Sequence, residues 1–267
     1  MDQEKQLDAL VERVVAGQKY RYVSRDLIRQ VGGRELAIRR NLKEAVKATK
    51  NKLHQVGGAY FETVIDYEQA LADLRAARGD PAAFRQVCRD IMNLHASTRE
   101  RLPILDDFFN ATLAELPPIR VVMDVACGLN PLARPWMPFG DQIEYLAYDI
   151  YTDMIDFIRE FLEIAGVKGQ AEVRDVIGNP PAQPADLAFI LKTLPCLEQV
   201  DKTAASRLLD TIQASYLLIS YPARSLGGRR KGMVENYEAH FWALAGGRNW
   251  IVQRFEFPTE LAFLVEV

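Results

Sequence analysis

The stretch DVACGLNPLARPWMP, residues 124–138, directly follows the apolar run 119–123, in which Arg120 is the one charged residue. An apolar run that ends in a turn of small residues predicts a strand of an α/β sheet, with a ligand site at the turn. A dinucleotide-binding turn has the pattern G-x-G-x-x-G, whereas this turn has Gly128 alone, followed by Asn130 and Pro131. A pyrophosphate ligand is therefore disfavoured here.

After residue 118 the chain alternates short β-rich runs with helical patterns. This alternation predicts right-handed βαβ units and a mainly parallel sheet. The last two runs are separated only by residues 258–260, which is too short for a crossover, so they are expected to form an antiparallel hairpin. The predicted fold is α/β, with a seven-stranded mixed sheet like that of class I (Rossmann-like) methyltransferases. Strands are predicted at 120–126, 143–150, 171–176, 186–192, 215–221, 250–257 and 261–267, and a helix at 152–166.

The first 105 residues have helical patterns, and two glycine pairs, at 32–33 and 57–58, are expected to separate the helices. Residues 34–58 predict one amphipathic helix with a basic outer face. Its inward residues are Leu36, Leu42, Val46 and Leu53, and its outward residues are Arg39, Arg40, Lys43, Lys47 and Lys50. We therefore expect two domains, a helical one over 1–105 and a sheet-containing one over 106–267.

Charge is concentrated in the helical part. The whole chain has a net charge of −3, yet residues 13–52 hold 12 Lys and Arg against 3 Asp and Glu. Such an excess is typical of a polyanion-binding surface, and a solvated helical face is the alternative. The chain has no apolar run of the ~18 residues that span a membrane, and its N-terminus does not resemble a secretory signal. A cytoplasmic protein is expected.

Acidic residues end three successive predicted strands. Because parallel strands bring their carboxyl ends to one edge, Asp124, Asp149 and Asp175 are expected to meet there. Asp149 is the expected acceptor for ribose hydroxyls and Asp175 for an adenine amino group; a helix N-cap is the alternative for each. A nucleoside without phosphate, such as S-adenosylmethionine, suits this pattern. The candidates beside them are Ala126, Cys127, Gly128, Ile150 and Val176.

Basic residues lie at the same edge. In segment 95–103, Ser97 and Glu100 form a possible capping box, and Arg99 or Arg101 is the alternative partner for a cofactor carboxylate. Lys192 ends an apolar strand and is expected to contact an anionic substrate backbone. The tract ARSLGGRRKGM, 223–233, predicts a phosphate clamp, with a solvated loop as its alternative. The three cysteines and three histidines are scattered, so no metal site and no catalytic triad are expected.

Four segments together resemble one known family: STRERLP (97–103), DVACGLNPLARPWMP (124–138), ILKTLPCLE (190–198) and YPARSLGGRRKGM (221–233). The family is that of the aminoglycoside-resistance 16S rRNA methyltransferases, which modify guanine N7 in the decoding site, and the resemblance covers most of the chain. It implies a cofactor, S-adenosylmethionine, that leaves as S-adenosylhomocysteine, and a helical N-terminal domain that docks on the 30S subunit. A monomer is expected.

The resemblance also implies roles for individual residues. Arg101, Gly128, Asp149 and Asp175 would surround the cofactor, with Ile150, Val176 and Leu191 lining it. The residues toward the target nucleotide would be Trp136, Lys192, Ser225, Arg229, Arg230 and Lys231.

Guanine N7 carries an in-plane lone pair, so its methylation needs no catalytic base, and positioning is the expected mechanism. The triplet Asn179-Pro180-Pro181 resembles part of the NPPY signature of amino-group methyltransferases, but it precedes the fourth strand and is followed by Ala182, so we reject that interpretation. Two alternatives stay open. One is a methyltransferase for another RNA or a small molecule, and the other is a noncatalytic RNA-binding ribosome factor.

Overall fold

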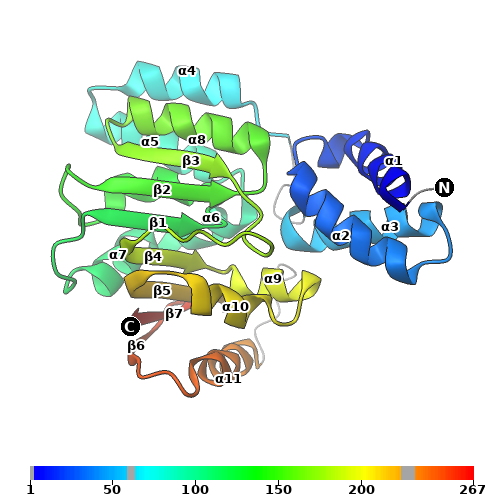
Figure 1. Ribbon diagram of the computed structural model, residues 1–267. Helices are drawn as coiled ribbons and strands as arrows, with labels where there is room; N and C mark the ends of the chain where they lie inside the picture. Colours follow the sequence, from blue (N-terminus) through cyan, green and yellow to red (C-terminus); the bar gives the residue numbers. More distant parts are fainter. Residues whose placement is uncertain (1–2, 59–63, 224–231) are drawn as a thin grey trace.

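A seven-stranded sheet forms the centre of the protein, in the strand order β3-β2-β1-β4-β5-β7-β6 (Figure 1). The computed structural model describes residues 3–58, 64–223 and 232–267. The first five strands are parallel, and β7 runs antiparallel to both β5 and β6. The mixed sheet and its terminal hairpin confirm the predicted fold. The strands are β1 (Val121–Val125), β2 (Glu144–Asp149), β3 (Lys168–Val173), β4 (Ala185–Leu191), β5 (Ala214–Pro222), β6 (Ile251–Glu256) and β7 (Glu260–Glu266).

The central strands form at the predicted positions because their side chains are apolar and buried on both faces. The edge strand β3 differs, since it begins three residues before the predicted start at Ala171. Lys168 and Gln170 of this strand are exposed, so the hydrophobic pattern that marks a buried strand is missing there. Pairing with β2, and not burial, defines β3.

Helices α4 (Tyr67–Ala77) and α5 (Pro81–Met92) lie beside α8 (Thr152–Ile164), which connects β2 to β3 (Figure 1). Aromatic rings hold this layer together, with Tyr67 stacked 4.8 Å from Phe157. Asp80 caps α5 and Pro81 occupies its first turn, as the sequence predicts. In space, therefore, the helices that follow residue 66 belong with the sheet, although the sequence suggests a boundary near residue 105. Two more helices of this part are α6 (Ala96–Arg101) and α7 (Leu105–Leu113).

Helices α1 (Gln3–Val15), α2 (Arg25–Ile38) and α3 (Leu42–Leu53) stand apart, facing the carboxyl ends of the parallel strands (Figure 1). The prediction that Gly32 and Gly33 separate two helices is wrong, because α2 runs through both. A Cβ at position 32 would lie 2.3 Å from Leu10 Cδ2, so Gly32 serves close packing of α1 on α2. The single helix predicted for 34–58 is also interrupted, since Asn41 caps a new helix by accepting from the Glu44 amide.

Main-chain hydrogen bonds join α1–α3 to the sheet. The Ser24 amide donates to the Ile150 carbonyl at 2.7 Å, and the Thr152 amide donates to the Tyr22 carbonyl at 2.8 Å. The link between α1 and α2 is therefore fastened to the turn that follows β2. Arg34 adds an ion pair with Asp201, 3.2 Å away.

The remaining helices complete the cover of the sheet. The longer ones are η4 (Asn130–Trp136), α9 (Leu194–Val200), α10 (Ala204–Thr211) and α11 (Met233–Ala245), and the single turns are η1 (Gln18–Tyr20), η2 (His54–Gly58) and η3 (Leu102–Ile104). None of the helices in the described part of the chain is long and apolar enough to cross a membrane.

Candidate functional site

A cavity opens at the carboxyl edge of the central strands. This edge is where open α/β sheets bind ligands. All the residues predicted from the sequence for the cofactor lie on its walls, although they come from five different parts of the chain. They are Arg101, Asp124, Ala126, Cys127, Gly128, Asp149, Ile150, Asp175, Val176 and Leu191.

The turn after β1 has a backbone that few residues adopt. Ala126 and Gly128 have φ angles of 52° and 51°, in the left-handed region. A Cβ at position 128 would lie 3.0 Å from the His95 ring, so glycine relieves both the backbone strain and the close approach. Ala126 has a Cβ and therefore adopts this left-handed backbone at a cost in strain. Backbone strain at non-glycine residues is concentrated at functional sites.

Asp149 and Asp175 are not helix caps. The Asp149 carboxylate accepts from the Gly128 amide at 2.9 Å and from the Ile150 amide at 2.6 Å, and thus ties the end of β2 to the turn after β1. Asp175 accepts from the Ile177 amide at 3.0 Å within its own turn. Burial raises the pKa of both carboxyls despite these hydrogen bonds. Each oxygen has a second acceptor site, so both residues retain capacity for a ligand.

Asp124 is fully buried and only half satisfied. Its Oδ2 accepts from the Tyr145 hydroxyl at 2.6 Å and from Asn130 Nδ2 at 2.8 Å. Its Oδ1 has no hydrogen-bond partner within the described residues. Burial raises the pKa of Asp124 to about 7, against the lowering effect of these two donors. A buried carboxylate oxygen without a partner, on the wall of a cavity, fits a ligand donor such as an ammonium group.

Arg101 lies at the same end of the cavity, with 2% of its surface exposed. Its Nε and Nη2 donate to the two carboxylate oxygens of Glu260, at 3.0 and 2.6 Å, and its Nη1 donates to Asn130 Oδ1 at 2.8 Å. No pattern in the sequence indicates Glu260, which is 159 residues away from Arg101 along the chain. Because Arg101 lines the cavity, it remains a candidate partner for a ligand carboxylate.

Lys192 joins the same polar cluster. It has a φ angle of 59° and is 5% exposed. Its Nζ donates to the Ser97 carbonyl at 2.7 Å and to Glu100 at 3.0 Å. Lys192 lines the cavity, but its Nζ is engaged by these two acceptors, so the contact with an anionic substrate backbone stays a prediction. The predicted capping box is wrong, because α6 begins at Ala96 with His95 as its N-cap residue, and Glu100 pairs with Lys192.

Of the two described residues predicted for the target nucleotide, Lys192 lines the cavity and Trp136 does not. Trp136 is 8% exposed and packs in the core, with the Arg85 guanidinium 5.6 Å from its ring, so no free face is presented for stacking. Ser225, Arg229, Arg230 and Lys231 lie outside the described residues. In the helical part Arg39, Arg40, Lys43 and Lys47 are exposed as predicted. Lys50, also predicted to face outward, is half-buried and lies over the Tyr20 ring.

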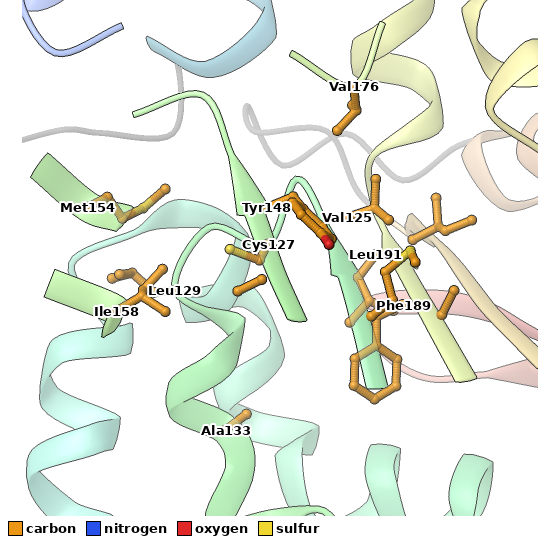
Figure 2. Close-up of a cluster of buried hydrophobic side chains, with 14 of the residues drawn as sticks. Val125, Cys127, Leu129, Ala133, Tyr148, Met154, Ile158, Val176, Phe189 and Leu191 are labelled. Atoms are coloured by element: carbon orange, nitrogen blue, oxygen red, sulfur yellow. The ribbon is translucent and has the colours of Figure 1, made fainter. Parts of the chain in front are cut away.

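Several cavity residues have no signal in the sequence. Leu27 and Gly57 come from α2 and η2, so the N-terminal helices close one wall of the site. His95 also lines the cavity. Burial lowers its pKa to about 3, and Lys192 and Arg99 add to the effect, so the imidazole is neutral. Figure 2 shows a cluster of buried apolar side chains from separate elements. Four of its labelled residues also line the cavity, namely Cys127, Met154, Val176 and Leu191. Only tertiary packing brings these residues together.

The family model described as "Ribosomal RNA methyltransferase (FmrO)" matches residues 16–265. A 16S rRNA (guanine(1405)-N(7))-methyltransferase of Frankia casuarinae is 40% identical, over 98% of this chain and 94% of the relative. The enzyme with the same description from Micromonospora echinospora is 34% identical, over 98% of this chain and 97% of its own.

Among solved structures, the 16S rRNA methyltransferase RmtF in complex with S-adenosyl-L-homocysteine superposes with a TM-score of 0.85 and 33% identity, covering 100% of this chain and 99% of its own. The 16S rRNA methylase RmtB gives a TM-score of 0.78 at 27% identity, covering 97% and 98%. The family match spans α2 and α3 as well as the sheet with its cavity. The chain therefore belongs to the FmrO family of ribosomal RNA methyltransferases.

Proposed function

We propose that this protein transfers a methyl group from S-adenosylmethionine to N7 of guanine 1405 in 16S rRNA, the reaction named for its relatives. The observation that carries the proposal is the cavity in which Asp124, Asp149 and Asp175 meet at three strand ends. The turn beside them is too poor in glycine for a pyrophosphate. Methylation of that base would confer aminoglycoside resistance.

The cavity fits the parts of the cofactor in order along the sheet edge. Asp149 would accept from the ribose hydroxyls, and Asp175, one strand further out, would accept from the adenine amino group. Arg101 and Asp124 would hold the amino-acid tail, the first through its guanidinium and the second through the unpartnered Oδ1. When bound, the sulfonium supplies the methyl group.

The residues around the cavity act by positioning. Guanine N7 has a lone pair in the plane of the ring, so no proton has to leave before the methyl group is accepted. The protein must hold the flipped base in line with the methyl group and exclude water. His95 is neutral near physiological pH because burial lowers its pKa, and we assign it packing against Gly128 instead of proton transfer.

We propose further that the substrate is the assembled 30S subunit, in the cytoplasm, and that the protein acts as a monomer. Within one chain, residues of α2 and η2 line the cavity together with the strand ends. Docking would use the exposed basic side chains of α1–α3. These helices lie within the region 1–105 that is expected to bind RNA. The segment with Ser225, Arg229, Arg230 and Lys231 would contact the target nucleotide.

Purified 30S subunits incubated with methyl-labelled S-adenosylmethionine would test the proposal. We expect one labelled guanine, at position 1405, with the label at N7. Label at another atom or base would contradict it, and label only in free RNA or a small molecule would favour a different methyltransferase. Binding to 30S without affinity for S-adenosylmethionine would favour a noncatalytic ribosome factor.

A further inference from the structure

We propose that Glu260, at the start of β7, is a positioning residue that fixes Arg101 for the amino-acid tail of the cofactor. Glu260 does not line the cavity, so it would act through Arg101 and not by touching the cofactor. The inference rests on the proposed function, because it names the residue that prepares the tail end of the same site.

The hydrogen bonds of Arg101 define what it still offers to a ligand. A guanidinium has five N–H donors. Glu260 takes one from Nε and one from Nη2, and Asn130 takes one from Nη1. One donor on Nη1 and one on Nη2 are left for a ligand carboxylate. The bidentate grip of Glu260 fixes the plane of the guanidinium, and thereby the direction of these two donors.

Glu260 is itself held on several sides. The Ser220 hydroxyl donates to Oε1 at 2.5 Å, and Lys192 Nζ lies 3.5 Å from Oε2. Burial opposes the ionisation of Glu260, but Arg101 and Lys192 outweigh it and lower its pKa. The carboxylate is therefore charged, and Arg101 stays fixed before a ligand arrives. Such preorganisation reduces the ordering cost of binding.

The position of the cluster at the sheet edge argues against a purely structural ion pair. Lys192 has a left-handed backbone at the end of β4, and Arg101 and Lys192 both line the cavity. A buried ion pair by itself is weak evidence for stabilisation of the fold, because desolvation offsets the attraction. Here both cations are brought to the cavity wall by one carboxylate that lies behind it.

The test compares two ligands that differ in the tail. S-adenosylhomocysteine carries the amino acid, whereas 5′-methylthioadenosine has the same nucleoside and no tail. Calorimetric titration of both into wild-type protein and Glu260→Gln would separate the tail from the nucleoside end. We expect Glu260→Gln to weaken the binding of S-adenosylhomocysteine roughly tenfold or more, which is the effect of losing a charge-assisted hydrogen bond. The binding of 5′-methylthioadenosine should weaken less than about twofold. Glu260→Asp, which keeps the charge, should recover part of the lost affinity.

Two further variants make the test decisive. Glu266→Gln lies on the same strand but is exposed, and it should change neither affinity. Ser220→Ala removes one hydrogen-bond donor to Glu260 and serves as the test if Glu260→Gln does not fold. It should weaken the binding of S-adenosylhomocysteine alone, by about threefold. Equal loss of both ligands, or no loss of either, in the folded variants would overturn the inference alone. Wild-type protein that binds neither ligand would overturn the proposed function with it.

Discussion

At the scale of single residues, the site follows from where carboxylates stand along the strands. The positions of Asp124, Asp149 and Asp175 could be predicted because parallel strands bring consecutive carboxyl ends together. The contacts of the neighbouring site residues could not be predicted. Glu260 meets Arg101 across 159 residues of sequence, and His95 reaches Gly128 from a different layer of the fold. Such contacts depend on tertiary packing, which leaves no local pattern.

Asp149→Asn is the sharpest single change in the nucleoside end. The substitution keeps the shape of the side chain but removes the charge that accepts from the Gly128 and Ile150 amides and, in our proposal, from ribose. We expect affinity for 5′-methylthioadenosine to fall about 100-fold, the sum of two charge-assisted hydrogen bonds near the lower end of their range. Calorimetry measures this directly. Asp107→Asn, exposed on α7, serves as the control, and an equal loss in both variants would refute the assigned role.

The raised pKa of Asp124 predicts a proton release on binding. The pKa rises from 3.8 to about 7 in the folded protein, so Asp124 stabilises the fold most below about pH 4, and this contribution is lost as pH rises through 7. An ammonium at Oδ1 favours the charged form. We therefore expect S-adenosylhomocysteine to release a proton when it binds at pH 6, measured by calorimetry in buffers of different ionisation enthalpy. Asp124→Asn should bind without this release, and an unchanged release would contradict the assignment.

At the scale of elements, the apolar pattern of the sequence predicted the buried strands. It failed where strand pairing or close helix packing determines the bounds of an element. The edge strand β3 begins three residues before the predicted start because its exposed side chains carry no hydrophobic signal. The glycine pair at 32–33 was read as a break, but α2 continues through it. A glycine that permits helix packing and one that ends a helix look alike in sequence.

Gly32 and Gly33 therefore make a matched pair for a stability measurement. A Cβ at position 32 would meet Leu10 Cδ2 at 2.3 Å, whereas at position 33 the nearest atom, Leu7 Cδ1, is 4.0 Å away. Gly33→Ala should raise the free energy of unfolding by up to about 1 kcal/mol, the helix propensity difference. Gly32→Ala should lower it by about 1–3 kcal/mol, the cost of overpacking. Denaturant unfolding measures both, and changes of the same sign would contradict the packing of α1 on α2.

At the scale of the whole molecule, the α1–α3 unit and the sheet share one site. The sequence predicted a helical part over residues 1–105 with a basic surface, whereas only α1–α3 stand apart from the sheet. It did not predict that α2 and η2 would form a wall of the cavity, or that the Ser24 and Thr152 amides would fasten the α1–α2 link to the turn after β2. In our proposal, RNA docking and cofactor binding use neighbouring surfaces but different side chains, so mutation should separate the two activities.

Charge reversal on α3 tests that separation. Lys43 and Lys47 are one turn apart, exposed, and without an ion pair in the described part of the chain. Lys43→Glu with Lys47→Glu should weaken 30S binding roughly tenfold or more and reduce the salt dependence, because two phosphate contacts are lost. Affinity for S-adenosylhomocysteine should stay within about twofold, since Coulomb interactions of exposed charges are screened beyond about 10 Å.

The control for this experiment has the same change in net charge at the opposite edge of the sheet. Arg120 and Lys168 are exposed at the amino ends of β1 and β3. Arg120→Glu with Lys168→Glu should leave 30S binding near the wild-type value, because the parallel strands place these residues away from the edge that α1–α3 face. Filter binding of 30S across a salt series measures both double variants. If they lose affinity equally, net charge and not the α3 surface governs docking, and the proposed RNA-binding role of these helices fails.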